Sequence, residues 1–169
     1  MKGLLLTIGA LAAASSLAFG VSSALAANHS AGAGTKVSVA SSGLGRVLVD
    51  GRGRTLYLFE KDKHGNSACT GQCATYWPPL IASAKPLATS GAKTSLLGIT
   101  KRGDGRLQVT YNHHPLYTFV KDTSKGQTNG EEVDAFGAEW YAVSAAGAKV
   151  ENTGAQSGAG DPASAGYGY

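Results

Sequence analysis

The chain has 169 residues, a net charge of +4 at pH 7 and two cysteines. This length fits one ordinary domain or two very small ones. The positive charge is too small and too scattered to indicate a nucleic-acid partner.

The first residues have the pattern of a secretory signal peptide. Lys2 gives a positive start, an Ala- and Leu-rich apolar run follows, and Ala24-Leu25-Ala26 supplies the small residues that a signal peptidase requires. Glycines and serines interrupt the run, so a retained membrane helix is the less favoured alternative. We expect residues 1–26 to be removed and the protein to be secreted, periplasmic or held in the cell envelope. No cysteine lies near this site and no later run spans a bilayer, so we expect neither lipidation nor a transmembrane segment in the mature chain.

Two segments of low complexity flank the part of the chain that can bury a core. Residues 27–42 are rich in Ala, Gly, Ser and Thr and predict a flexible lead, with a short strand over 36–40 left open. Residues 151–169 are again rich in Gly, Ala and Ser and predict a disordered tail. The foldable domain is therefore expected over residues 43–150.

This foldable part contains an internal repeat. Residues 45–62 align without a gap with residues 105–122, and Gly, Arg, Val, Leu, Tyr, Phe, Lys and Asp recur at matching positions. So many matches in one register favour two copies of one structural unit. We place the copies at residues 45–82 and 105–145.

Each copy predicts two strands around a turn. In the first copy, the glycines of residues 50–54 suit a hairpin turn between two apolar strands. In the second copy, residues 112–115 form the turn. The strand before it alternates apolar Leu107, Val109 and Tyr111 with polar residues, which is the pattern of a sheet with one solvated face.

Further strands are expected over residues 96–100 and 140–144, with one short helical turn between 67 and 77. The fold class is therefore all-β, with two tandem β-hairpin units that form a small antiparallel sheet domain. A lone two-stranded hairpin is marginally stable in water, so each unit needs the other to cover its apolar face.

Cys69 and Cys73 are expected to form a disulfide, because an exported chain meets an oxidising compartment. The bond would fix the loop ahead of Trp77, which we expect to plug the core. Two alternatives stay open, a metal pair with His64 and a redox-active dithiol.

The two copies share a Tyr-x-Phe-x-x-Asp motif, and a tryptophan follows each. These motif residues are Tyr57, Phe59, Asp62 and Trp77 in the first copy, and Tyr117, Phe119, Asp122 and Trp140 in the second. The favoured interpretation is that the aromatic rings pack the core and each aspartate caps the turn that follows it. The alternative is an exposed aromatic platform with a nearby carboxylate, suited to a sugar, a peptide or a planar ligand.

Three histidines are candidate metal ligands. His113 and His114 are adjacent, and His64 lies in the matching loop of the first copy, with Asp62 or Asp104 as further oxygen ligands. A surface copper or zinc site is one interpretation. No ligand spacing fixes a geometry, however, so exposed turn histidines are favoured and we expect no cofactor.

Enzyme signatures are absent from the sequence. It holds no Gly-x-Ser-x-Gly elbow, no His-Glu-x-x-His and no phosphate-binding glycine loop, and the acidic run 131–134 predicts a solvated loop or a weak calcium contact. We therefore expect a non-catalytic binding or structural module that meets an envelope or extracellular ligand. A metal- or redox-linked envelope protein and a cell-wall or sugar hydrolase are the alternatives.

The motifs resemble those of a bacterial secreted repeat family of unknown function, many of whose members are predicted lipoproteins. The resemblance rests on the paired Tyr-x-Phe-x-x-Asp motifs, the Cys-x-x-x-Cys-Ala-x-x-Trp-Pro-Pro-Leu run and the second Pro-Leu-Tyr, and it covers about residues 43–145. It implies export and a repeat architecture, and it carries over no catalytic residue. This chain departs from the family in lacking a lipidation cysteine, and it has Asn112-His113 where relatives often have Asn-Gly. Asn tolerates a positive φ, so we expect the turn to be kept.

Overall fold

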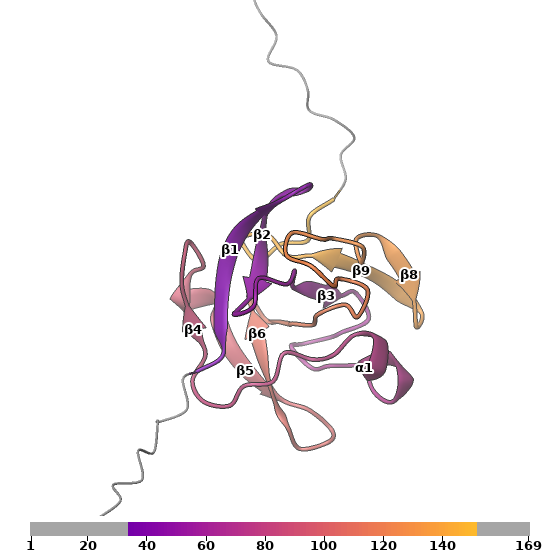
Figure 1. Ribbon diagram of the computed structural model, residues 1–169. Coiled ribbons are helices and arrows are strands. Elements are labelled where there is room, and N and C mark those ends of the chain that lie inside the picture. The colour runs from indigo at the N-terminus through magenta and orange to yellow at the C-terminus, as the bar shows by residue number, and fades with distance from the viewer. Residues whose placement is uncertain (1–33, 152–169) are drawn as a thin grey trace, which may run out of the picture.

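The computed structural model describes residues 34–151 (Figure 1). The expected signal peptide, its cleavage site and all but the first residue of the expected tail lie outside the described residues. The described part consists of short strands in small sheets with very little helix, which confirms the all-β class. In this part no helix is long and apolar enough to cross a membrane.

The first unit comprises residues 36–82 and begins earlier than expected. Its elements, with the short strand that follows it, are β1 (Lys36–Ser42), β2 (Gly45–Asp50), β3 (Tyr57–Phe59), α1 (Gln72–Tyr76) and β4 (Leu87–Ala88). The short strand that the sequence left open over 36–40 is present as β1, which extends to Ser42 and pairs antiparallel with β2. Residues 36–42 are therefore not a flexible lead, and Val37 and Val39 bury their side chains. The predicted helical turn is α1.

The second unit comprises residues 97–145. Its elements, with the 3-10 turn before it, are η1 (Thr94–Leu96), β5 (Leu97–Lys101), β6 (Leu107–Tyr111), β7 (His114–Pro115), β8 (Val133–Ala135) and β9 (Ala138–Ala142). The strand predicted over 96–100 is confirmed as β5. The strand predicted over 140–144 starts earlier, at Ala138, because a tight turn pairs it with β8.

The hairpin turns of the two units differ in length. In the second unit Tyr111 pairs with His114 around a two-residue turn, with φ of 48° at Asn112 and 67° at His113. These angles are those of a type I′ hairpin turn, which requires positive φ at both central residues. In the first unit Asp50 Oδ1 accepts the backbone N–H groups of two turn residues, and the turn is one residue longer.

This difference corrects the gapless alignment within β2. Leu56 N–H donates to the carbonyl of Leu48 at 2.9 Å, and Leu116 N–H donates to the carbonyl of Val109 at 3.0 Å. Leu48 is therefore the structural equivalent of Val109, whereas the gapless alignment matched Val109 with Val49. The Val-Leu-Val run of residues 47–49 fits either register, because an apolar side chain stands at every position.

The solvated face predicted for β6 is also wrong. Gln108 and Thr110 are buried, while Leu107 is 45% exposed. Gln108 Nε2 donates to the carbonyl of Leu116 at 2.8 Å, and its Oε1 accepts a 2.6 Å bond from Arg102. A buried amide is tolerated here because both of its polar atoms have partners.

The two units exchange their last extended segments, of which that of the second unit includes β9 and that of the first forms isolated bridges. Residues 140–145 of the second unit pair with the first, where Leu48 N–H donates to the carbonyl of Val143 at 2.7 Å. Residues 77–82 of the first unit pair with the second, where Val109 N–H donates to the carbonyl of Leu80 at 2.8 Å. Each unit therefore receives an extended segment from the other unit.

A local two-fold relation follows from this exchange. Tyr57 and Tyr117 lie opposite each other and exchange both backbone hydrogen bonds, at 2.9 and 3.0 Å. Figure 1 shows β3 of the first unit beside β9 of the second. Neither unit contains the partner strand that its own hairpin requires, so the pair forms one folding unit.

Two clusters of buried side chains make up the core. One is aliphatic, with Tyr111 and Tyr141 among valines and leucines from both units. The other contains six aromatic rings and the cysteine pair: Tyr57, Phe59, Trp77, Tyr117, Phe119, Trp140, Cys69 and Cys73. All the aromatic residues that the sequence motif singled out lie in this second cluster.

Candidate functional site

Four of the motif rings form one continuous stack. The order is Phe59, Trp140, Trp77, Phe119, with ring centroids 4.1, 3.9 and 4.1 Å apart. Rings from the two units alternate along the stack, so that each tryptophan contacts the phenylalanine of the other unit. None of the four is more than 5% exposed. The interpretation of these rings as an exposed ligand platform is therefore wrong, because they are core side chains.

The motif tyrosines and aspartates are bonded across the two units. Tyr57 Oη donates to Asp122 Oδ2 at 2.6 Å, and Tyr117 Oη donates to Asp62 Oδ2 at 2.8 Å. Hydrogen bonds from a phenol to a carboxylate are among the stronger ones in proteins. The motif therefore joins the units, because the tyrosine of each repeat donates a hydrogen bond to the aspartate of the other repeat.

The second oxygen of each motif aspartate holds the loop that follows it. Asp62 Oδ1 accepts the N–H of Ala68 at 2.7 Å, and Asp122 Oδ1 accepts the N–H of Asn129 at 2.9 Å. Burial raises the pKa of Asp62 to about 6, although its hydrogen bonds from Ala68 and Tyr117 favour the ionised form.

Arg102 supports the Asp62 side of this arrangement, and sequence reasoning missed it. Its side chain is buried and donates to Ser67 Oγ, Gln108 Oε1 and the carbonyl of Cys69, each at 2.6 Å. The Ser67 hydroxyl in turn shares a 2.7 Å hydrogen bond with Tyr117 Oη. No sequence pattern marks this arginine, because its partners come from separate segments.

The disulfide is formed as expected. Cys69 and Cys73 are bonded with their Cα atoms 5.3 Å apart, and neither is more than 5% exposed. The described residues contain no free cysteine. The bond closes the α1 loop immediately before the Trp77 ring.

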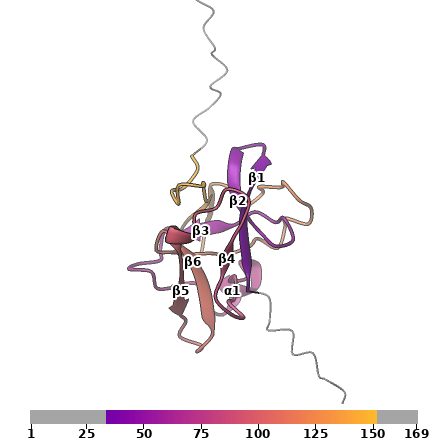
Figure 2. The same cartoon turned by 90° about the vertical axis from the view of Figure 1, so that its left-hand side faces the viewer.

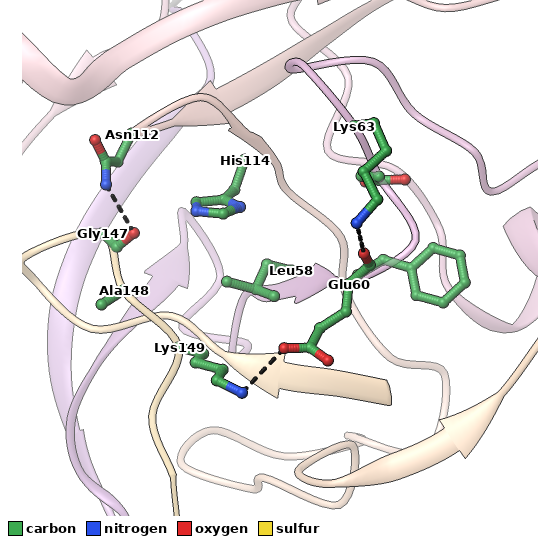
Figure 3. Close-up of a pocket in the computed structure, with 10 residues that line it drawn as sticks. Leu58, Glu60, Lys63, Asn112, His114, Gly147, Ala148 and Lys149 are labelled. Carbon is green, nitrogen blue, oxygen red and sulfur yellow. Dashed lines mark hydrogen bonds and ion pairs between the residues drawn. The ribbon is translucent and has the colours of Figure 1, made fainter. Parts of the chain in front are cut away.

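A cavity of about 550 Å³ opens beside Asp62 (Figure 3). Its walls come from the end of β3, the turn before β7 and the segment after β9. The residues that line it are Leu58, Phe59, Glu60, Asp62, Lys63, Asn112, His114, Gly147, Ala148 and Lys149. Three segments far apart in sequence thus meet around one hollow.

His114 is directed into this cavity (Figure 3). The residue is half-buried, and its ring nitrogens have no hydrogen-bond partner among residues 34–151. Burial, with a smaller contribution from His113, lowers the pKa of His114. A half-buried neutral imidazole offers one donor and one acceptor to a molecule in the cavity.

Charged groups of both signs surround the ring. Lys149 Nζ lies 3.0 Å from Glu60 Oε1 and 2.9 Å from Glu151 Oε1, so this ammonium is paired. Lys63 Nζ donates to the carbonyl of Glu60 at 3.0 Å, and its positive charge also acts on the Asp62 carboxyl, whose pKa it lowers. The lining therefore presents donors and acceptors without a large excess of one charge.

The three candidate metal ligands do not converge. His114 faces the cavity, while His64 and His113 are exposed. Within the described ranges, no group of three or more His, Cys, Asp or Glu side chains is arranged to hold a metal ion. His113 is the second central residue of the hairpin turn and His114 is the first residue of β7, so the two adjacent side chains have different surroundings.

The acidic run is not a solvated loop throughout. Residues 133–135 form β8, and Glu131 turns one carboxylate oxygen inward to accept the N–H of Ala142 at 2.7 Å. The other oxygen of Glu131 is buried without a hydrogen-bond partner within the described residues. Desolvation raises the pKa of Glu131 to about 7, with a smaller contribution from Glu132.

The comparison with family models agrees with the repeat boundaries seen in the structure. Residues 38–81 and 98–144, more than half of the chain, each match the model of a family described as a secreted repeat of unknown function. Each matched range runs from the first strand of a unit to its exchanged last strand. Neither the curated proteins nor the solved structures contain a match to this chain. The chain therefore belongs to this family of secreted repeats of unknown function.

Proposed function

We propose that the protein is an exported, non-catalytic binding module whose ligand occupies the cavity between Asp62 and His114. Membership of a secreted family supports an extracytoplasmic location. The observation that carries the proposal is the half-buried His114 ring, which faces a cavity of about 550 Å³ without a hydrogen-bond partner in the described residues. Polar groups in such positions are usually satisfied by a bound molecule or by ordered water.

The chemistry of the lining favours binding over hydrolysis. Both oxygens of Asp62 already accept hydrogen bonds, from Ala68 and Tyr117, and Glu60 is paired with Lys149. A glycoside hydrolase needs one carboxyl group that is free to protonate a leaving group and a second that attacks or activates water. The two carboxyl groups here are committed to the fold and to an ion pair.

The same lining defines the class of ligand. The cavity lies within the range of small-molecule sites, about 300–1,000 Å³. Its groups with remaining hydrogen-bonding capacity are the His114 ring, the Lys63 ammonium and one oxygen of Glu60, above the apolar side chain of Leu58. This set suits a small polar molecule, neutral or zwitterionic, such as an amino acid or a sugar.

Native mass spectrometry of the exported protein, purified from the medium or envelope of its own host, tests this proposal. We expect a stoichiometric small-molecule adduct that is lost in His114→Ala. His113→Ala is the matched control, since the neighbouring histidine is exposed and does not line the cavity, and it should retain the adduct.

Two measurements together would contradict the proposed site. A bare mass for the wild type would exclude a tightly held ligand. Titration with free amino acids and monosaccharides, followed by the ring signals of His114 in NMR spectra, would then address weak binding. If those signals also stay unmoved at millimolar concentrations, the proposed site is wrong.

A further inference from the structure

The outer edge of β5 has no partner strand, whereas the corresponding edge of β1 is covered. In the described part of the chain, β5 is the end strand of the sheet β5-β6-β7, while β1 lies between β2 and β4. Figure 1 shows β4 running along β1, and Figure 2 shows β5 beside β6 at the lower left of the molecule. The two edges belong to equivalent strands of the two units.

The equivalence can be fixed residue by residue. Leu48 and Val109 are structural equivalents, because each accepts the same hairpin hydrogen bond. Val39 lies opposite Leu48 in β1, and Ile99 lies opposite Val109 in β5. Ile99 therefore occupies in the second unit the place that Val39 occupies in the first.

In the first unit this edge binds an extended segment of the chain itself. Val39 N–H donates to the carbonyl of Ser90 at 3.1 Å, and the carbonyl of Val37 accepts the N–H of Thr89 at 2.9 Å. The segment runs parallel to β1, with Val37 opposite Ala88. Val39 is consequently only 8% exposed.

The same backbone groups are turned outward along β5. Asn112 N–H donates to the carbonyl of Leu96, and Arg102 N–H donates to the carbonyl of Arg106. In an antiparallel ladder the hydrogen-bonded pairs alternate, so the even-numbered residues of this segment bond to β6. The odd-numbered residues direct their backbone groups to the free edge.

These odd-numbered residues form an open strand edge. Ile99 and Lys101 present both N–H and carbonyl groups there, and Leu97 presents its carbonyl, since its N–H is bonded to Thr94. Ile99 is 43% exposed, in contrast to the 8% of its equivalent Val39. An exposed apolar edge of this kind is a template for adding a strand.

The surface beside the edge specifies the chemistry of the strand that fits. A hollow of about 280 Å³ lies next to it, with Pro86, Leu97 and Ile99 among its lining residues. Lys85 lines the same hollow, Lys101 ends the strand, and residues 85–103 contain no acidic side chain. The edge therefore combines an apolar recess with two nearby positive charges.

We propose that the outer edge of β5 docks an extended segment of another protein that carries an apolar side chain between acidic ones. The segment adds as a strand on the backbone groups of Ile99 and Lys101, as residues 87–90 do on β1. Its apolar side chain enters the hollow, and its carboxylates lie near Lys85 and Lys101. A second copy of this chain is disfavoured as the occupant, because pairing two such edges brings like charges together.

Two synthetic peptides probe this edge on the exported protein. One carries Leu-Ala-Thr-Ser, the sequence of residues 87–90, between two pairs of glutamates, and the other replaces the glutamates with lysines. We expect the glutamate peptide to slow amide hydrogen exchange at Ile99 and Lys101 by about tenfold or more. The lysine peptide should bind about tenfold more weakly or not at all.

Variants separate backbone pairing from a general surface effect. Ile99→Pro removes the outward N–H, and proline is tolerated on edge strands where the N–H faces solvent. This variant should lose the protection at Lys101, and Lys101→Glu should weaken the glutamate peptide while leaving the backbone intact. Val120→Thr, at another exposed apolar residue, is the control that should change nothing.

Three results would overturn the proposal. The first is the absence of any change at β5 with millimolar glutamate peptide. The second is equal binding of both peptides, which removes the acidic specificity. The third is protection of Ile99 that appears with rising protein concentration and no peptide, which would assign the edge to a second copy.

Discussion

The two halves of the molecule carry the same motif in different surroundings. Asp122 is only 3% exposed and holds Asn129 and Tyr57, whereas Asp62 borders an open cavity and lies beside the buried Arg102. The shared residues have the same structural role in both halves, because each tyrosine donates a hydrogen bond to the aspartate of the other unit. The repeated motif residues therefore hold the units together. The residues that differ between the two halves provide the surfaces that a ligand or partner can reach.

The same contrast holds at the sheet edges. The edge of β1 is covered by residues 87–90, while the edge of β5 is open. The linker between the units thus protects one copy and leaves its equivalent exposed.

The largest expected effect comes from the ring stack that both halves share. Trp140→Ala removes contacts with Trp77 and Phe59, and replacing a buried tryptophan by alanine typically costs about 3–5 kcal/mol. Urea unfolding followed by circular dichroism measures this loss. Tyr76→Ala, at a residue 43% exposed, is the control and should cost less than about 1 kcal/mol. Similar losses for the two variants would contradict the central place of the stack.

The two tyrosine–aspartate bonds are expected to differ in strength. Tyr57→Phe leaves the buried Asp122 without its phenol donor, and losing a hydrogen bond to a charged group costs about 1.5–3 kcal/mol. Tyr117→Phe should cost less, because water from the cavity can replace the donor at Asp62. Paired urea melts of the two variants compare them directly. A larger loss for Tyr117→Phe would show that the Asp62 side is the tighter one.

The Asp62 half should also respond to pH. The ordinary pKa of 3.8 is raised to about 6 in the folded protein, so folding favours the protonated carboxyl. This contribution to stability is complete below about pH 4 and is lost as the pH rises through about 6. A tenfold change in proton affinity corresponds to about 1.4 kcal/mol, so the whole contribution is at most about 3 kcal/mol.

Asp62→Asn removes this dependence and serves as the test. The difference in unfolding free energy between wild type and variant should fall between pH 4 and 6 and stay level above about 7. Taking the difference cancels the titration of Glu131, whose pKa of about 7 overlaps the window. A difference that does not vary with pH would show that Asp62 titrates normally.

The smallest effect is expected at the hairpin turn of the second unit. His113 has a φ of 67°, a conformation that favours glycine, and Asn-Gly is the preferred pair in a type I′ turn. His113→Gly should stabilise the protein by up to about 1 kcal/mol, measured as a rise in the urea midpoint. Gly45→Ala in the first unit, at a φ of 88°, should move the midpoint the other way. No rise for His113→Gly would mean that the imidazole makes an unrecognised contact.

Much of the architecture could be predicted from the sequence. The Tyr-x-Phe-x-x-Asp repeat, the all-β class and the strand at β5 follow from alternation, turn residues and motif recurrence. The disulfide follows from the oxidising compartment that an exported chain is expected to meet. The strand exchange could not be predicted, because a repeat alignment shows that two units are alike and does not show which unit a strand pairs with. Burial of Gln108 was missed for a similar reason, since its partner Arg102 becomes visible only once the chain has folded.

The candidate site was predicted only in part. Asp62 is predicted to cap the turn that follows it, and it does so by accepting the N–H of Ala68. His114 is predicted to be an exposed turn residue, with metal ligation as the alternative, whereas the structure directs it into the cavity. Their meeting at one cavity depends on residues 147–149, which carry no motif. A single chain gives no signal for a hollow whose walls are three unrelated segments.

The exchange of strands and side chains between the units is the central claim, and a pair of double-mutant cycles tests it most directly. One cycle combines Tyr57→Phe with Asp122→Asn, and the other combines Tyr57→Phe with Asp62→Asn, which lies in the same repeat as Tyr57. The structure predicts a coupling energy of about 1 kcal/mol or more between Tyr57 and Asp122, and a much smaller one between Tyr57 and Asp62. Stronger coupling between Tyr57 and Asp62 would contradict the account, because each hairpin would then satisfy its own motif.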